Sequence, residues 1–409
     1  MINSGDTAWV LISAALVMLM TPGLAFFYGG MVRKKNVLSI LMQCFIVLCL
    51  LSVQWVLYGY SISFAPSAGF WGGFKWFGLA GVGLEPYADY AGTIPHQAFM
   101  IFQAMFAIIT PALILGAFAE RMKFSAFLAF ILLWATFVYG PVCHWVWGVG
   151  GWLKNSGVLD FAGGTVVHVN AGIAALATAL FIGKRKNLDK NIPAPHNMPF
   201  VVLGTALLWF GWFGFNAGSA LAANGLAVNA FVVTNTAAAA AGLSWAIIEW
   251  LRNGKPTIFG VASGAVAGLV AITPAAGFVS VIPAIIIGIL VSVFCFTAVS
   301  VIKPKMGYDD ALDAFGVHCV GGIWGALATG LFASKLVNPA GSNGLFFGNP
   351  KQFLVQLTAV GVTLVYSFVM SMIIYKVVDL IIGVRVDEKE ELMGLDLTQH
   401  RESAYTVLE

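Results

Sequence analysis

Two histidines, His168 and His318, lie 150 residues apart in segments that are otherwise apolar or built from small residues. The stretches that follow them are similar, since HVNAGIAAL (168–176) and HCVGGIWGAL (318–327) both have glycine at the fourth position after the histidine and isoleucine at the fifth. Two neutral imidazoles held side by side titrate as a coupled unit, and each offers one N–H and one lone pair. Such a pair could guide a small polar molecule or relay a proton along an apolar path.

An acidic residue precedes each histidine. Asp160 stands before FAGG at the start of an apolar run, where a carboxylate can accept the free backbone N–H groups of a helix N-terminus. Asp313 stands before the second histidine segment at a different spacing and is expected to do the same. Helix capping is the main role expected for both carboxylates, and an electric field on a nearby cation is the secondary one.

Three other segments carry aromatic residues at helical spacing. They contribute Phe102, Gln103 and Phe106, then Trp145 and Trp147, and then Trp212, Phe215 and Ser219. A single tryptophan near a helix end is usually an anchor at the membrane interface. If the three segments meet, however, they form an aromatic cup with one hydroxyl. Such a cup suits a small cation, which it would hold by cation–π attraction and a hydrogen bond.

The composition predicts that helices in a membrane position these residues. Hydrophobic residues make up 59% of the 409 residues and charged residues only 10%, with a mean hydropathy of +0.88. The net charge is +3, and no basic cluster interleaved with aromatics appears, so nucleic acid is not an expected partner. The five cysteines have no metal-type spacing, and neither a metal nor a cofactor is expected. The first apolar run lacks a preceding basic region and is expected to remain as a helix.

Apolar runs long enough to cross a bilayer predict eleven transmembrane helices. The predicted spans are 8–30, 38–58, 97–118, 124–147, 162–183, 198–220, 227–251, 257–276, 280–302, 314–333 and 354–382. Basic residues gather in alternate connections, after spans one, three, five, seven, nine and eleven. They are Arg33, Lys34, Lys35, Arg121, Lys123, Lys184, Arg185, Lys186, Lys190, Arg252, Lys255, Lys303, Lys305, Arg385, Lys389 and Arg401. The positive-inside rule then predicts an outer N-terminus and a cytoplasmic C-terminus in the cytoplasmic (inner) membrane.

The two histidine segments are five spans apart, so they run in opposite directions. This predicts an all-α membrane protein with an inverted five-plus-five helix repeat, about 8–183 and 198–335, and an extra C-terminal helix. The transmembrane domain is expected over 1–383 and a cytoplasmic regulatory tail over 384–409. The small residues after each histidine, Gly172 and Gly322 among them, would let the two helices approach and bring the rings together.

Several motifs together resemble the ammonium transporters of the Amt/Rh superfamily, and the likeness covers essentially the whole chain. They are TPGLAFFYGGMVRKKN (21–36), DFAGGTVVHVNAG (160–172), APHNMP (194–199), GWFGFNAGSA (211–220), AITPAAG (271–277) and FGVHCVGG (315–322). The sequence is closer to the bacterial ammonium branch than to the Rhesus branch. It departs from the family at Arg401, where members usually carry glycine, and at Cys319, where glycine is common.

The resemblance implies a role for particular residues. The outer ammonium site corresponds to Phe106, Trp147 and Ser219, the phenylalanine gate to Phe106 and Phe215, and the twin histidines to His168 and His318. Trp212 and Gln103 would lie near that path, and Asp160 corresponds to the carboxylate implicated in structure and ammonium recruitment.

The resemblance also implies a transporter rather than an enzyme. Ammonium would be deprotonated and ammonia conducted past the histidines, with a proton relay as an open question and methylammonium as a substrate analogue. Members are homotrimers in the lipid bilayer, and a P-II type regulatory protein often binds the tail. Two alternatives remain: an ammonium sensor that signals through the tail, and a membrane redox subunit with a bis-histidine haem.

Overall fold

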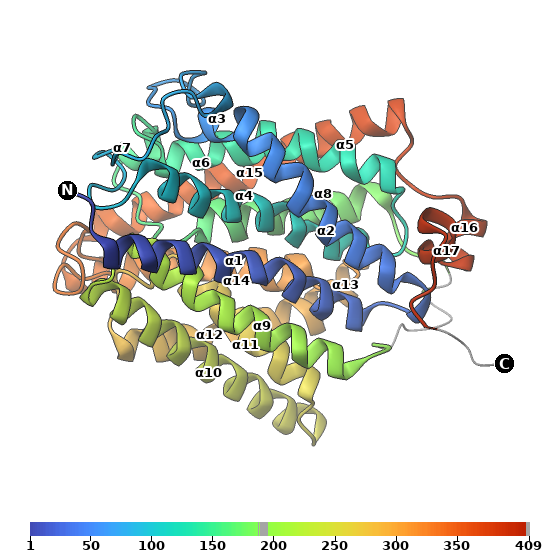
Figure 1. The fold of residues 1–409 in the computed structure, drawn as a ribbon. Coiled ribbons are helices and arrows are strands. Elements are labelled where there is room, and N and C mark those ends of the chain that lie inside the picture. The colour runs from blue at the N-terminus through green and yellow to red at the C-terminus, as the bar shows by residue number, and fades with distance from the viewer. Residues whose placement is uncertain (187, 189–194, 406–409) are drawn as a thin grey trace.

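The computed structural model describes residues 1–186, 188 and 195–405. The expectations for Lys190, for Ala194 of the APHNMP motif and for the last four residues of the tail, 406–409, lie outside this part of the chain. The described residues form helices and no strand longer than an isolated bridge. Long helices run side by side across the molecule, which confirms the predicted all-α class (Figure 1).

The helices follow the predicted spans closely. Those of the first repeat are α1 (Ser4–Met31), α2 (Val37–Gln54), α3 (Tyr60–Phe64), α4 (His96–Phe118), α5 (Phe124–Trp134), α6 (Gly140–Trp147), α7 (Trp152–Asn155) and α8 (Asn170–Ile182). Those of the second are α9 (Met198–Ala217), α10 (Gly225–Asn253), α11 (Ile258–Ile272), α12 (Val281–Thr297), α13 (Lys303–Met306) and α14 (Val320–Phe332), and α15 (Pro350–Ile381) follows. Short 3₁₀ turns are η1 (Lys34–Asn36), η3 (Phe77–Leu79), η6 (Gly218–Ala220) and η9 (Leu345–Phe347).

Five π-helical turns interrupt or begin the spans. They are η2 (Trp55–Gly59), η4 (Ala135–Tyr139), η5 (Gly164–Val169), η7 (Ala298–Ile302) and η8 (Phe315–Cys319). The turns η4 and η7 lie in the fourth span of each repeat, and η5 and η8 open the fifth. π-turns occur often at functional sites. Their matching positions support the inverted repeat, and η5 and η8 contain the two histidines.

Ten helical spans in the described residues are long and apolar enough to cross a membrane. The predicted span 257–276 is shorter, because α11 has 15 residues and is about 22 Å long. Its start lies beside the end of α10, where Glu249 accepts the backbone N–H of Thr257 at 2.7 Å. Its continuation lies beside the start of α10, where Asn229 donates to the carbonyl of Ala276 at 3.1 Å. The segment 257–276 therefore runs alongside α10 from one end of that helix to the other. The count of eleven spans stays a prediction.

The C-terminal tail lies at the end of the molecule opposite the N-terminus, as α16 (Glu388–Met393) and α17 (Leu395–His400) (Figure 1). It is fixed to α2 and to the connection after α8 by polar contacts. Glu391 accepts the backbone N–H of Lys186 at 2.6 Å, and Asp396 accepts that of Ser39 at 2.8 Å. Arg401 follows α17 with φ 57° and ψ 33°, a left-handed conformation in which glycine is unstrained. A glycine at this position, as the family resemblance implies, would adopt this conformation without strain.

Candidate functional site

A buried carboxylate begins the helix that carries the first histidine. Asp160 accepts four backbone N–H groups with its two oxygens. The donors are Gly163 at 2.8 Å, Gly164 at 2.6 Å, Thr165 at 2.8 Å and Val166 at 3.1 Å. The N-cap expected at Asp160 is present, and it holds the start of η5, which lies four residues before His168.

In the second repeat the expectation for Asp313 is wrong, because Asp310 takes the capping position. Asp310 accepts the N–H of Ala314 at 3.1 Å and of Phe315 at 2.8 Å. Asp313 instead has φ 59° and binds the ammonium group of Lys303 at 2.5 Å. Asp310 precedes His318 by eight residues, the spacing between Asp160 and His168. The two halves of the repeat therefore match in their caps, and both caps lie eight residues before a histidine.

The two histidine rings face each other in the interior. Their centroids are 5.5 Å apart with an interplanar angle of 16°, and the residues are 1% and 3% exposed. Neither ring nitrogen of His168, nor Nδ1 of His318, has a hydrogen-bond partner among the described residues. Buried polar atoms are almost always paired, so these three ring nitrogens are unusual and are available to hydrogen-bond a small polar molecule. The predicted meeting of His168 and His318 is confirmed as geometry.

Glycines allow this approach, and they do so reciprocally. A Cβ on Gly172 would lie 2.2 Å from the backbone nitrogen of Cys319, the residue after His318. A Cβ on Gly322 would lie 3.0 Å from both the Cβ of His168 and the backbone nitrogen of Val169. Each glycine thus contacts the other repeat's histidine segment, as a two-fold relation between the repeats requires.

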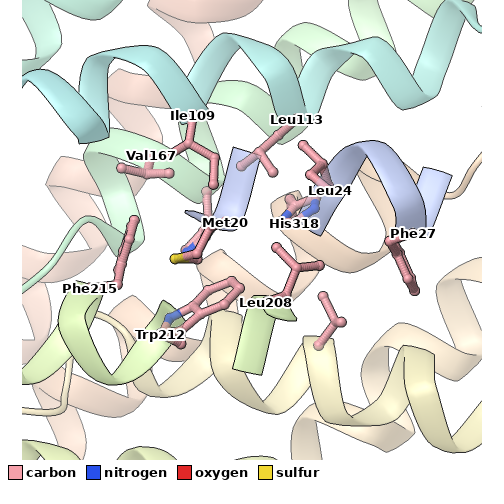
Figure 2. A pocket seen from close by; sticks show the side chains of 12 residues that line it. Met20, Leu24, Phe27, Ile109, Leu113, Val167, Leu208, Trp212, Phe215 and His318 are labelled. Atoms are coloured by element: carbon pink, nitrogen blue, oxygen red, sulfur yellow. The ribbon is translucent and has the colours of Figure 1, made fainter. Parts of the chain in front are cut away.

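A narrow, mostly apolar cavity lies beside the histidines (Figure 2). About 10 Å³ of it can hold the centre of a water-sized molecule, roughly the room for one water. Its lining is Met20, Leu24, Phe27, Ile109, Leu113, Val167, His168, Leu208, Trp212, Phe215, Val266 and His318. Trp212 stacks on His168 with centroids 5.4 Å apart, while its indole N–H donates to Thr273 at 2.9 Å. Trp212 therefore presents its ring, and not its N–H, to the cavity.

Two phenylalanines separate this cavity from a wider one near the N-terminal end of the molecule. Phe106 and Phe215 lie with centroids 4.3 Å apart, tilted by 32°. Phe215 lines the narrow cavity and Phe106 the wider one. Both side chains are buried, at 1% exposure, and their rings lie between the two spaces.

The wider cavity, here called the outer vestibule, has about 230 Å³ for small molecules. It is lined by Phe64, Asp89, Tyr90, Phe99, Gln103, Phe106, Trp147, Lys154, Asp160, Phe161, Ser219, Leu221 and Phe278. The predicted cup of Phe106, Trp147 and Ser219 is thus brought together with Gln103 and Asp160. Four other aromatic residues named with these segments do not line it: Phe102, Trp145, Trp212 and Phe215, of which the last two line the narrow cavity.

The polar atoms of the vestibule favour a cation. Ser219 donates its hydroxyl proton to the carbonyl of Phe215 at 2.8 Å, which leaves its oxygen lone pairs for a donor guest. The Oε1 atom of Gln103 is buried without a partner in the described chain. Trp147 is held edge-to-face with Phe106 at 5.9 Å, and its indole N–H donates to the carbonyl of Asp160 at 2.8 Å. The site offers aromatic faces and oxygen acceptors together.

A third cavity of about 890 Å³ opens on the side of the tail, bounded in part by a buried ionic cluster that sequence reasoning missed. Arg185 binds Asp309 through two hydrogen bonds of 2.9 Å and Glu120 at 3.2 Å. Burial alone would raise the pKa of Asp309, but hydrogen bonds from Arg185 and the charge of Arg121 lower it to about 2. This cluster fixes the loop that leads to the Asp310 cap.

The bis-histidine haem alternative does not match this geometry. A haem would need the volume of a macrocycle between the two rings, and the reciprocal glycine contacts close that space. Within the described residues, no three His, Cys, Asp or Glu side chains are grouped to hold a metal ion.

Residues 8–405 match the model of the Ammonium Transporter Family. The chain belongs to the ammonium transporter family. An ammonium transporter of Bacillus subtilis is 55% identical over 401 residues and aligns with 98% of each chain. Ammonium transporter Amt1 of Archaeoglobus fulgidus is 50% identical over 405 residues, which are 99% of this chain and 100% of that one. The crystal structure of Candida albicans Mep2 is similar with a TM-score of 0.90 and 38% identity, covering 98% of this chain and 90% of that one.

Family membership has two plain consequences. The chain is a multi-pass membrane protein of a transporter family, and it is not an enzyme. The resemblance inferred from the motifs is confirmed, and the similar transporters include bacterial ones. The roles of the individual pore residues go beyond this assignment.

Proposed function

We propose that this protein transports ammonium across the cytoplasmic membrane. Ammonium binds in the outer vestibule, and ammonia is conducted through the narrow cavity past the histidines. The observation that carries the proposal is the pair of facing histidines, His168 and His318, with three unpaired ring nitrogens beside a narrow apolar cavity. Buried polar atoms without partners need a small polar guest, and a cavity of this size admits one the size of water.

Recruitment takes place in the outer vestibule. Ammonium is a compact cation with N–H donors, and Phe106 and Trp147 supply aromatic faces while Ser219 and Gln103 supply oxygen acceptors. The carboxylate of Asp160 adds a negative charge close by, although its four backbone hydrogen bonds make capping its main role.

Deprotonation follows from the change of surroundings. Beyond Phe106 and Phe215, the cavity is lined by aliphatic and aromatic groups, in which an unpaired cation loses its hydration without replacement. Neutral ammonia avoids that cost and can donate to, or accept from, a neutral imidazole. The pore therefore selects the uncharged form, and each ammonium leaves one proton behind.

The fate of that proton decides whether transport carries charge. His168 and His318 can pass a proton between them, because each neutral ring has one donor and one acceptor nitrogen. We infer that the proton follows through this pair and that uptake is electrogenic.

The experiment that tests the proposal is a current measurement on proteoliposomes of the purified protein. A saturable current on addition of ammonium, a smaller one with methylammonium and none with potassium are expected. Equal responses to ammonium and potassium, or no response in vesicles that contain folded protein, would refute the proposal.

Orientation, assembly and regulation belong to the same proposal. The N-terminus lies outside and the tail inside, three copies form a homotrimer in the bilayer, and a P-II type regulatory protein binds the tail face. The tail contacts of Glu391 with the connection after α8, and of Asp396 with α2, support a regulatory role for it. Chemical cross-linking in membranes is expected to yield a trimer. The sensor alternative predicts signalling that persists in a variant unable to carry current.

A further inference from the structure

The outer vestibule contains an ammonium group that belongs to the protein itself. Lys154, in α7, donates from Nζ to the carbonyl oxygen of Trp147 at 3.0 Å. The same Nζ lies 5.5 Å from the centroid of the Tyr90 ring, within the range of a cation–π contact. Lys154, Tyr90, Trp147 and Asp89 all line the vestibule.

The groups around this ammonium form a fixed platform. The hydroxyl of Tyr90 donates to the carbonyl of Phe64 and accepts the N–H of Val149 at 3.0 Å, and its ring stacks on Phe99 with centroids 4.7 Å apart at 10°. The carbonyl of Trp147 belongs to the residue whose ring forms part of the proposed ammonium cup. Tyr90 is therefore held in place by contacts other than Lys154.

The Tyr90 ring and the Trp147 carbonyl can bind a free ammonium ion by the same contacts that they make with the ammonium group of Lys154. Both are compact cations that donate N–H groups to oxygen and lie over aromatic faces. Lys154 is exposed at the vestibule edge, so its side chain can leave the position without opening the core. Asp89, also exposed, supplies a negative charge whether or not Lys154 is present.

We propose that the Tyr90 ring, the Trp147 carbonyl and Asp89 form an outer cation subsite for ammonium or a small primary alkylammonium, and that Lys154 occupies it as a tethered competitor. The inference rests on the proposed function, because it assigns an entry step to the same vestibule. An incoming cation must displace Lys154 and approach its charge, and so Lys154 sets a higher half-saturation concentration than the cup alone would have.

The test compares ammonium-dependent currents of the wild type with those of Lys154→Met, which keeps most of the length of the side chain and removes its charge. Two like charges about 6 Å apart at the water surface repel enough to change affinity by roughly threefold. Lys154→Met is therefore expected to lower the half-saturation concentration about threefold or more, with the maximal current unchanged. Asp89→Asn is expected to raise it.

Lys351→Met is the matched control, since Lys351 is an exposed lysine at the start of α15, on the same predicted side, and does not line the vestibule. An unchanged or raised half-saturation concentration in Lys154→Met, or an equal fall in Lys351→Met, overturns the subsite.

A second readout keeps this inference separate from the transport proposal. Ammonium chloride, compared with sodium chloride, is expected to raise the thermal midpoint of the detergent-solubilised protein, and to do so at lower concentration in Lys154→Met. If the wild type carries no current, the transport proposal fails, and this binding comparison still decides the subsite. Identical ammonium titrations of the two proteins would overturn it.

Discussion

Replacing Asp160 with asparagine removes a charge and two hydrogen bonds without changing the volume of the side chain. Each oxygen of Asp160 accepts two backbone N–H groups, so whichever way the new amide points, its NH₂ group faces two donors. The residue is only 7% exposed, and water cannot readily replace the lost partners. At about 1.5–3 kcal/mol for each hydrogen bond to a charged acceptor, Asp160→Asn is expected to cost roughly 3–6 kcal/mol.

The second repeat provides the matched control. Each oxygen of Asp310 accepts one backbone N–H, so Asp310→Asn loses one bond where Asp160→Asn loses two. Its expected cost is about 1.5–3 kcal/mol by the same reasoning. The assay is thermal unfolding in detergent at one heating rate, which ranks the apparent midpoints of the variants. The reasoning is refuted if Asp160→Asn melts with the wild type, or if Asp310→Asn loses more stability than Asp160→Asn.

Three further variants test other parts of the structure. Arg401→Gly relieves a left-handed conformation that costs a non-glycine residue about 1–2 kcal/mol, so limited proteolysis should cleave the tail more slowly; equally fast cleavage would contradict the strain. The pKa of Asp309 is lowered to about 2, so its ion pair with Arg185 stabilises the fold above about pH 4 and is lost as the pH falls from about 4 to 2. Over that range the thermal midpoint should fall more steeply in the wild type than in Asp309→Asn. Parallel curves of midpoint against pH would argue against the ion pair. Gly172→Ala places a methyl group 2.2 Å from the backbone nitrogen of Cys319, so it should lower the midpoint and the ammonium current together; a variant with wild-type values would show that the helices can separate at no cost.

Hydropathy predicted most of the fold because a membrane restricts what an apolar run can do. The span 124–147 coincides with α5, η4 and α6 together, the span 198–220 coincides with α9 and η6 together, and the others deviate by a few residues. The exception is α11, which ends at Ile272, while residues 273–276 of the predicted span form a buried turn. These residues are apolar or small because they pack against the surrounding protein, and not because they continue a helix. Run length does not encode that contact.

The candidate site was predicted where residue type and repeat symmetry coincide. His168 and His318 met as expected, because matching glycines mark the faces along which their helices touch. Asp313 is the acidic residue nearest before His318 in the sequence, and its ion-pair partner, Lys303, is identified only by the folded loop. The interaction of Arg185 with Asp309 joins residues 124 apart, and nothing local in the sequence signals it.

The most direct test of the central claim is the ammonium current of a variant in which both His168 and His318 are alanine. Proteoliposomes containing this variant are compared with the wild type, and unfolding midpoints show that the variant is folded. The histidine control is His196→Gln, because His196 contacts the carbonyl of Val32 and the hydroxyl of Tyr405 and lines neither the narrow cavity nor the outer vestibule. If the histidine pair receives ammonia and relays its proton, the selective, ammonium-dependent current is lost in the double variant and kept in the control. An undiminished current that still excludes potassium would contradict the account.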